Sequence, residues 1–184
     1  MPENKDSPTQ HDDFFDVPAV WAVEPPPARS LDSPAPDTLA QWCAGMKQLR
    51  EPIGLELHSG ENWSIEIRVA ASSWISGQTT GPSSRGVFVT FQAVSALMGP
   101  IGTDLPSADP VDIPLFDALA HSLRVNSRIA VSAHSRRIAG SVSQRGEDYL
   151  ALHTTERLSS GQQLRVVPLA AIDYISFLEP GDSF

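Results

Sequence analysis

The chain has one cysteine, Cys43, among 184 residues and no long apolar run. A single cysteine excludes an internal disulfide and cannot supply a cysteine framework for a metal. No apolar stretch reaches the roughly 18 residues that a membrane-spanning helix needs. The N-terminus MPENKDSPTQ is acidic and has no apolar signal segment. We therefore expect a cytoplasmic protein with no membrane partner.

Basic charge is also scarce, with 13 Lys and Arg against 22 Asp and Glu and a net charge of −9. Residues 1–37 hold eight acidic and two basic side chains, so most of the imbalance lies there. Residues 38–110 hold six and four, and residues 111–184 hold eight and seven. Nonspecific nucleic-acid binders usually carry a basic footprint. The overall charge therefore disfavours nonspecific DNA binding, although a local basic patch is compatible with it.

Motifs for catalysis and metal binding are missing as well. The histidines show no ligand spacing to one another or to Cys43, which we interpret as a core or boundary residue. There is neither a GxSxG elbow nor a glycine-rich phosphate loop. We therefore expect no enzyme, no catalytic residue, no metal and no cofactor.

Residues 1–37 contain eight prolines and many acids, a composition typical of a disordered tail. Within this tail lies the acidic–aromatic island DDFFDVPAVWAV. Phe14, Phe15 and Trp21 are candidate partner-binding residues, because a short aromatic motif can dock on another protein. The alternatives are that the island packs along its own barrel or is simply disordered.

A helix is predicted after an N-cap at Asp37 or Thr38, and Pro52 ends it. Its apolar face recurs at helical spacing and consists of Leu39, Trp42, Met46 and Leu49. Five strands should follow, with apolar and polar residues alternating most clearly in the first two. Their expected ranges are 53–59, 63–70, 72–78, 87–91 and 93–98. Trp63 and Trp74 are interpreted as side chains that plug a barrel.

The same unit then recurs after a Pro/Gly/Asp-rich linker at residues 100–112. The second helix presents Leu115, Phe116, Leu119 and Leu123. The second set of strands is expected at 127–133, 136–144, 148–154, 164–167 and 171–177. Matching QAVSALMG with AAIDYISF supports a duplication. The expected domains are residues 38–99 and 113–178.

The segment PLFDALAHSLRVNSRIAVSAHSRRIAGSVSQ resembles the bacterial RNA chaperone Hfq and other Sm-like proteins. The shared features are the helix, the first strand and a glycine in the second strand, here Gly140, where a glycine allows a sharp bend. Residues 38–177 also resemble a group of actinobacterial proteins with two such units. The resemblance implies an all-β protein with short helices, in which two tandem five-stranded Sm/SH3-like barrels each follow an α-helix.

The sequence departs from the Hfq pattern at positions linked to RNA. Hfq-like proteins have a Lys-His pair before the last strand that helps to bind uridine-rich RNA. This chain has Leu169 and Ala170 there, and Phe91 and Gln92 in the first copy. Ile65 stands near the place of the bend glycine in that copy. The resemblance thus implies the fold, while the usual RNA pocket is missing.

The one basic cluster includes Arg136, Arg137 and Arg145, which are candidate contacts for RNA or another anionic ligand. The alternative is a solvated turn and strand face. We predict a non-enzymatic protein-interaction or adaptor module whose partner is another protein. The alternative is an Sm-like RNA-binding regulator with RNA as partner. Open strand edges would also allow a homo-oligomer.

Overall fold

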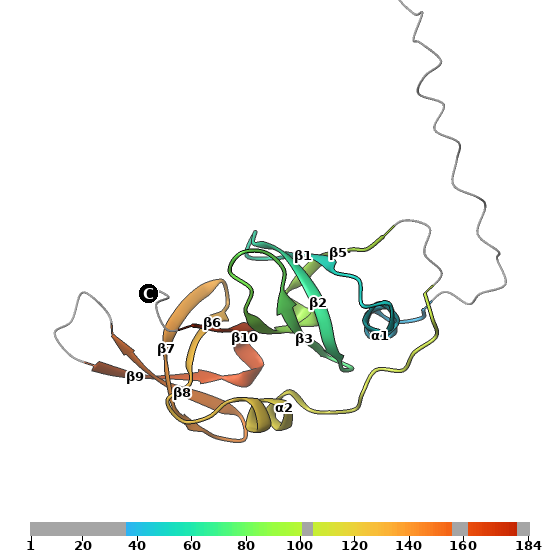
Figure 1. The fold of residues 1–184 in the computed structure, drawn as a ribbon. Helices are drawn as coiled ribbons and strands as arrows, with labels where there is room; N and C mark the ends of the chain where they lie inside the picture. The colour runs from blue at the N-terminus through green and yellow to red at the C-terminus, as the bar shows by residue number, and fades with distance from the viewer. Residues whose placement is uncertain (1–35, 101–104, 156–161, 180–184) are drawn as a thin grey trace, which may run out of the picture. The chain divides into compact units, whose positions relative to one another are not determined.

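A computed structural model describes residues 36–100, 105–155 and 162–179, all of which belong to one compact unit. The predicted disordered tail, with Phe14, Phe15 and Trp21, lies outside the described residues except for its last two positions. The protein is mostly β, as predicted, and the helix–five strands pattern occurs twice (Figure 1).

We call the first set of elements the first half and the second set the second half. The first half consists of α1 (Leu39–Leu49), β1 (Ile53–Leu57), β2 (Asn62–Ala70), β3 (Trp74–Thr79), β4 (Gly86–Thr90), the 3-10 turn η2 (Phe91–Ala93) and β5 (Val94–Met98). The second half consists of α2 (Leu115–Ser122), β6 (Arg128–Ala133), β7 (Arg136–Arg145), β8 (Tyr149–Thr155), β9 (Gln162–Pro168), the 3-10 turn η3 (Leu169–Ala171) and β10 (Ile172–Phe177).

Helix α1 begins at the predicted cap. The Thr38 hydroxyl accepts a hydrogen bond from the Gln41 backbone, and the Gln41 side chain accepts one from the Thr38 backbone. This capping box satisfies two backbone donors that the first turn leaves unpaired. Arg50 ends the helix in the left-handed conformation. The buried face includes Ala40, Cys43 and Met46, while Trp42 and Leu49 are half-buried. The predicted apolar face is therefore only partly right, because Leu39 is exposed.

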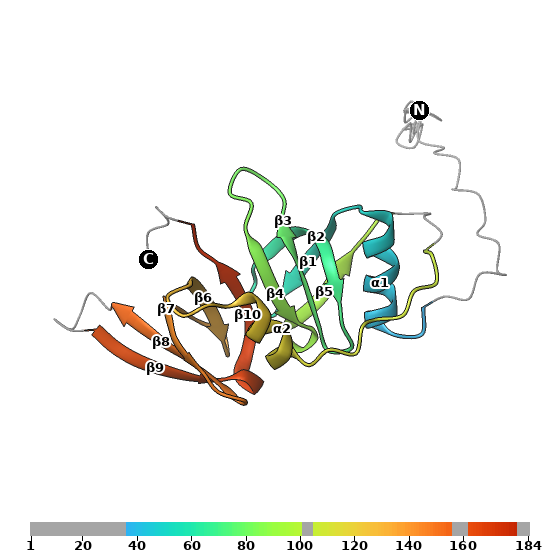
Figure 2. The same ribbon diagram turned by 60° about the horizontal axis from the view of Figure 1, so that its bottom comes forward.

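The ten strands form one continuous antiparallel sheet in the order β5-β1-β2-β3-β4-β10-β6-β7-β8-β9. Each half has the same internal order, namely fifth, first, second, third and fourth strand. The fourth strand of the first half, β4, pairs with the fifth strand of the second half, β10 (Figure 2). Among the described residues, the pairing does not close either half into a barrel.

Each half has a register shift in its second strand, after Ile67 in β2 and after Val142 in β7. Close to each shift lies one glycine at which any other residue would collide with the backbone of the neighbouring strand. A Cβ atom on Gly140 would collide with the backbone oxygen of His153, and one on Gly77 would collide with that of Glu66. The close-contact glycine thus lies in the third strand of the first half but in the second strand of the second half.

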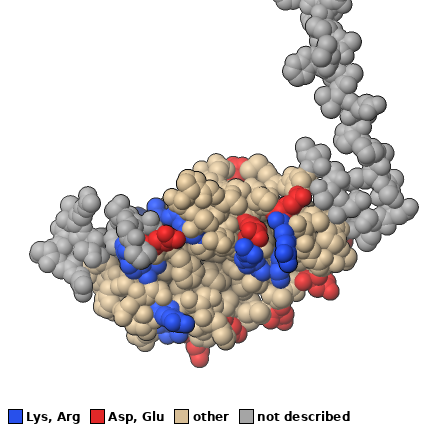
Figure 3. All heavy atoms as spheres, viewed as in Figure 1, with Lys and Arg blue, Asp and Glu red and all other residues tan. Residues whose placement is uncertain are grey.

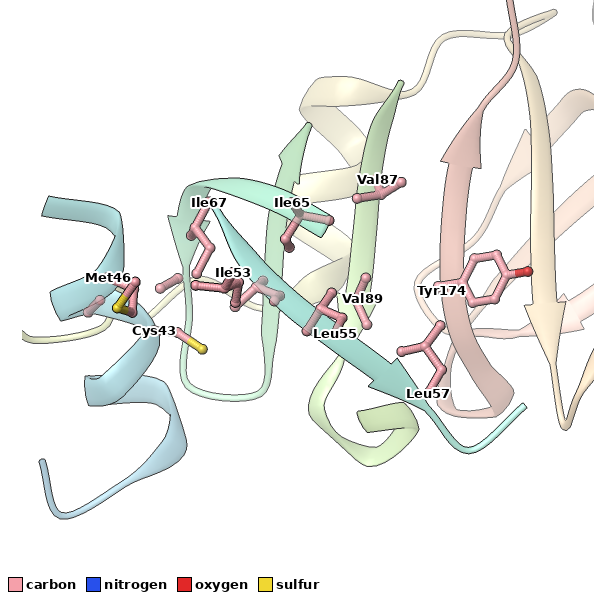
Figure 4. Packing of buried hydrophobic residues seen from close by; sticks show 13 residues of the cluster. Cys43, Met46, Ile53, Leu55, Leu57, Ile65, Ile67, Val87, Val89 and Tyr174 are labelled. Carbon is pink, nitrogen blue, oxygen red and sulfur yellow. The ribbon is translucent and has the colours of Figure 1, made fainter. Parts of the chain in front are cut away.

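Two clusters of buried apolar side chains form the core, and each contains residues from both halves. The first cluster takes Tyr174 from β10 (Figure 4). The second takes Ala71, Trp74 and Phe88 from the first half. The buried Trp74 therefore fills the core of the second half instead of plugging its own. Because the halves exchange core residues, neither buries its apolar surface alone.

The part of the predicted linker that the structure describes packs against the first half. Leu105 and Ala108 contact the first cluster. The backbone nitrogen of Val111 donates a 2.9 Å hydrogen bond to the oxygen of Ala70, and Val111 forms a parallel bridge with Ala71. These contacts position the start of α2 beside β2 and β3.

Candidate functional site

The joint between the halves is a strand pair reinforced by side chains. Val89 of β4 lies opposite Tyr174 of β10. The Thr90 hydroxyl lies 3.1 Å and 3.0 Å from the backbone oxygens of Ile172 and Asp173, its two acceptors. Gln92 donates from its amide to the oxygens of Ala170 and Ile172 at 3.1 Å and 3.2 Å. These bonds fix the register between β4 and β10.

Tyr174 makes the most specific contacts across the joint. Its hydroxyl donates a 3.0 Å hydrogen bond to Oε1 of Glu61, and its ring meets Trp63 edge to face at 4.5 Å between centroids. Burial raises the pKa of Tyr174 most, followed by the Glu61 bond and charge, while Arg137 and Arg85 act in the opposite direction. Residues of both halves thus converge on one hydroxyl group.

The repeated strand order shows which strands at the outer edges correspond to the joined ones. Aligning the two register shifts matches β5 of the first half with β10, and β9 of the second half with β4. Strands β5 and β9 are the ends of the sheet, and within the described residues neither has a second partner strand. The free edges therefore correspond to the two edges that pair inside the molecule.

Equivalent residues have opposite exposure at the joint and at the free edges. Phe88 of β4 is 8% exposed, whereas Val166, its equivalent in β9, is 57% exposed. Ser176 of β10 is 2% exposed, whereas Met98, its equivalent in β5, is 53% exposed. Leu164 of β9 is also exposed. The free edges therefore expose apolar side chains at positions whose equivalents are buried in the joint.

The predicted basic cluster is divided by the structure. Arg136 and Arg137 are exposed at the tight turn from β6 to β7. Arg145 instead donates to the backbone oxygens of Leu119 and Ala120 near the end of α2. Arg85, which no sequence pattern singles out, acts on the same tyrosine as Arg137. It lies far from Arg137 in sequence, and only the fold brings them together.

The surface charge is mixed on the face that Figure 3 shows. Basic side chains lie in separate groups among acidic ones, and neutral residues cover most of the surface. A broad basic patch is therefore missing from this face, in agreement with the near balance of charge in residues 38–184.

One hollow of about 520 Å³ lies where the two 3-10 turns meet. Phe91 and Gln92 line it from η2, and Leu169 and Ala170 line it from η3. These are the four residues that stand in place of the Lys-His pairs on our alignment. The described lining contains no Lys, Arg or His side chain that could bind a phosphate.

A second hollow, which we call the α2 groove, has a volume of about 550 Å³. Val69, Ser76 and Phe88, on three neighbouring strands, form its floor. Helix α2 and the residues before it form its wall, where the polar side chains include those of Asp112, Asp117 and His121. The Trp74 indole, beside the floor, donates a 2.9 Å hydrogen bond to the oxygen of Ile113, which holds the wall in place.

Cys43 is buried, and burial raises the pKa of its thiol to about 12. A thiol with such a pKa is a poor nucleophile at neutral pH. In residues 36–100, 105–155 and 162–179, no three His, Cys, Asp or Glu side chains are grouped as metal ligands. The helices in these ranges are too short to cross a membrane.

The joint, the two free edges and the α2 groove are thus the features that the geometry offers for binding. Comparison with family models, with curated proteins and with solved structures found no match to this chain.

Proposed function

We propose that the chain is a non-enzymatic protein-interaction module that binds further copies of itself through the free edges β5 and β9. One observation carries this proposal: the free edges are the equivalents of the joined edges and expose apolar residues where the joint buries them. A free edge presents unpaired backbone donors and acceptors, which readily pair with another strand.

We further propose that each half has the strand topology of the Sm-like fold. The shared strand order, the helix before the first strand and the 3-10 turn before the fifth strand support this assignment. Gly140 and Gly77 support it too, because each permits close strand contact near the register shift of its half. The assembly proposed above depends only on the strand order and the edges.

The internal joint serves as a template for the contact between chains. Ile175 lies opposite Phe88 in the joint, so Leu97 of one chain should lie opposite Val166 of the next. Val166 would then cover the first core cluster, which Leu97 borders. Because the two edges differ, the contact is head-to-tail, and repeated addition gives a closed ring or an open chain.

This outer contact should be weaker than the internal joint. Ala96 stands in the place of Tyr174, and Arg136 stands in the place of Glu61, so the hydrogen bond between Tyr174 and Glu61 has no counterpart. The aromatic contact with Trp63 is lost as well. Self-association should therefore be reversible and depend on protein concentration.

Light scattering over a dilution series tests the proposal. Val166→Asp places a charge in the expected contact and should raise the dissociation constant by about tenfold or more. Val125→Asp is the matched control, because Val125 is 61% exposed but lies between α2 and β6. A wild-type chain that stays monomeric at all concentrations, or equal effects of both variants, would refute the proposal.

A pair of cysteines tests the register. Leu97→Cys combined with Val166→Cys should form disulfides between chains under mild oxidation, because directly opposed strand residues meet the geometric requirement. Leu97→Cys with Leu164→Cys is two residues out of register and should crosslink much less. Equal crosslinking of the two pairs in a non-reducing gel would exclude the proposed register.

The predicted docking motif of Phe14, Phe15 and Trp21 lies outside the described residues and stays a prediction. Affinity capture with the wild-type chain and with the Phe14→Ala/Trp21→Ala variant tests it. Loss of a captured protein from the variant, with self-association unchanged, would assign an adaptor role to the tail. Unchanged capture would remove these residues from the proposal.

RNA binding is the second candidate function, favoured by Arg136 and Arg137 at an exposed turn and by the nearness of Arg85 and Arg137 to Tyr174. Guanidinium groups bind phosphates, and such binding weakens as salt rises. A labelled oligouridine should bind the wild type and lose affinity for Arg136→Ala/Arg137→Ala, with a shallower salt dependence. Arg68→Ala is the control, because Arg68 pairs with Glu66. Equal affinity of the three proteins for the oligouridine would exclude Arg136 and Arg137 as the RNA-binding residues.

A further inference from the structure

The α2 groove is built for a ligand with an apolar body. Its floor consists of Val69, Ser76 and Phe88, which face α2 from β2, β3 and β4. Its volume of about 550 Å³ lies within the range of small-molecule sites, roughly 300–1,000 Å³. Phe88 is 8% exposed and belongs to the second core cluster, so this part of the floor is held firmly.

The floor contains one polar group that the protein itself does not use. Ser76 is 9% exposed, and within the described part of the chain its hydroxyl has no hydrogen-bond partner. Ser176 Oγ is the one fully buried side-chain polar atom without a partner among the described residues, so the Ser76 hydroxyl is open to the groove, where water or a ligand can bind it. Ser76 therefore offers a hydrogen bond at the bottom of an otherwise apolar surface.

The wall of the groove supplies negative charge. Asp112 and Asp117 both line it, and neither carboxylate forms an ion pair with a described residue or accepts a hydrogen bond from one. His121 also lines it, with Nδ1 at 2.7 Å from the backbone oxygen of Asp117. Because that oxygen can only accept, Nδ1 donates, and Nε2 is the ring nitrogen left for a ligand.

We propose that the α2 groove binds a small organic cation, an ammonium or guanidinium group carried on an aromatic or branched aliphatic body. The body would lie on Val69 and Phe88, the cation would pair with Asp112 and Asp117, and Ser76 would bind a polar atom of the ligand. The chain's own aromatic island is a poor occupant, because its Asp12, Asp13 and Asp16 would face these carboxylates.

The inference goes beyond the proposed self-association and does not depend on it, because the groove contains no residue of β5 or β9. Three probes of nearly equal shape test it on the full chain: phenethylamine, its neutral counterpart phenethyl alcohol and the anionic phenylacetate. Amide chemical shifts in the NMR spectrum report binding at Ser76, Phe88 and Ala118, which line the groove.

We expect phenethylamine to shift these amides and to bind about fivefold or more tightly than phenethyl alcohol, with phenylacetate weakest. Asp112→Asn/Asp117→Asn should remove the preference for the cation while leaving the neutral probe unchanged. Asp109→Asn/Asp148→Asn, which changes two exposed acids outside the groove, is the matched control.

Two results would overturn the proposal. One is equal binding of the three probes to the wild type, which would leave only an unspecific apolar surface. The other is a cation preference that persists in Asp112→Asn/Asp117→Asn or that disappears equally in the control variant. Ser76→Ala separates the two parts of the site, because it should weaken all polar probes without changing their order by charge.

Discussion

At the residue scale, Tyr174 links the two halves in three ways. Its backbone pairs with β4, its ring packs in the first core cluster beside Leu57, and its hydroxyl bonds to Glu61 (Figure 4). Burial of the ring stabilises the folded state, and the hydrogen bond of the hydroxyl fixes the orientation of the side chain. A neutral hydroxyl bonded to a carboxylate in a buried joint resists ionisation.

This environment predicts lower stability in alkali. A group whose pKa is raised by folding contributes stability below its unfolded pKa and loses it as the pH rises through the folded pKa. Tyrosine ionises near pH 10 in an unfolded chain, and the pKa of Tyr174 is raised by burial and Glu61. The Cys43 thiol, with its pKa raised to about 12, has the same sign. The free energy of unfolding should therefore fall as the pH rises above about 9.

Urea unfolding at several alkaline pH values measures the effect. Tyr174→Phe should cost about 1 kcal/mol at neutral pH and should flatten the decline above about pH 10. Tyr149→Phe is the control for a tyrosine outside the joint. Identical pH profiles for wild type and Tyr174→Phe would contradict this account of the joint.

Gly140 gives a second prediction at this scale. A methyl group there would collide with the backbone oxygen of His153, which cannot move without shifting β8. Gly140→Ala should therefore lower the free energy of unfolding by roughly 2–4 kcal/mol. At Gly54 a methyl group would meet the flexible side chain of Met98, so Gly54→Ala should cost less. Thermal denaturation compares the two, and equal losses would mean that strand contact at Gly140 is not limiting.

At the element scale, Arg145 acts on a helix. Its guanidinium donates to the Leu119 and Ala120 oxygens in the last turn of α2. The Leu119 oxygen also accepts a 2.8 Å hydrogen bond from the Leu123 backbone nitrogen, so Arg145 adds a second donor there. A positive charge at a helix C-terminus is also favourable. These contacts give Arg145 a structural role. Its predicted role as a contact for an anionic ligand stays a prediction.

Arg145→Gln should therefore destabilise the protein by about 1 kcal/mol. Arg136→Gln, at the exposed turn, should leave the stability unchanged within about 0.5 kcal/mol. Urea denaturation of both variants checks this difference. If Arg136→Gln destabilises as much as Arg145→Gln, the helix contact does not explain the effect.

Local patterns predicted the elements well, because each depends on neighbours in sequence. The alternation of Ile65, Ile67 and Val69 predicted β2, and Thr38 marked the start of α1. All ten strands were predicted, with ends differing by a few residues. Gly140 was recognised as a bend glycine, whereas Gly77 was overlooked because its role depends on a contact with the neighbouring strand.

The joint could not be predicted from such patterns. Nothing near Trp74 or Phe88 in the sequence indicates that they belong to the core of the second half. The α2 groove likewise combines Ser76 with Asp112 and Asp117, more than thirty residues away. Sites of this kind depend on pairing between distant segments, which composition and periodicity do not encode.

At the scale of the whole molecule, the shared cores make the halves interdependent. Phe88 and Trp74 come from the first half but are buried among residues of the second, and Tyr174 does the reverse. Removing either half would expose these side chains to water. The described residues should therefore unfold together, although two repeats are visible in the sequence.

Calorimetry should show one transition whose calorimetric and van't Hoff enthalpies agree. Phe88→Ala should lower the stability of that single transition by about 3–5 kcal/mol. A chain shortened to residues 36–100 should lack a cooperative transition, because it lacks Tyr174 and leaves the β10 edge of β4 unpaired. Two separate transitions in the full chain would show instead that the halves fold independently.

The pairing of β4 with β10 also constrains stoichiometry. In the proposed assembly, one joint in every two would lie within a single polypeptide, so dilution could separate the assembly only at alternate joints. Dissociation would stop at the intact chain, and any closed ring would contain an even number of halves. An assembly with an odd number of halves would require a cut chain.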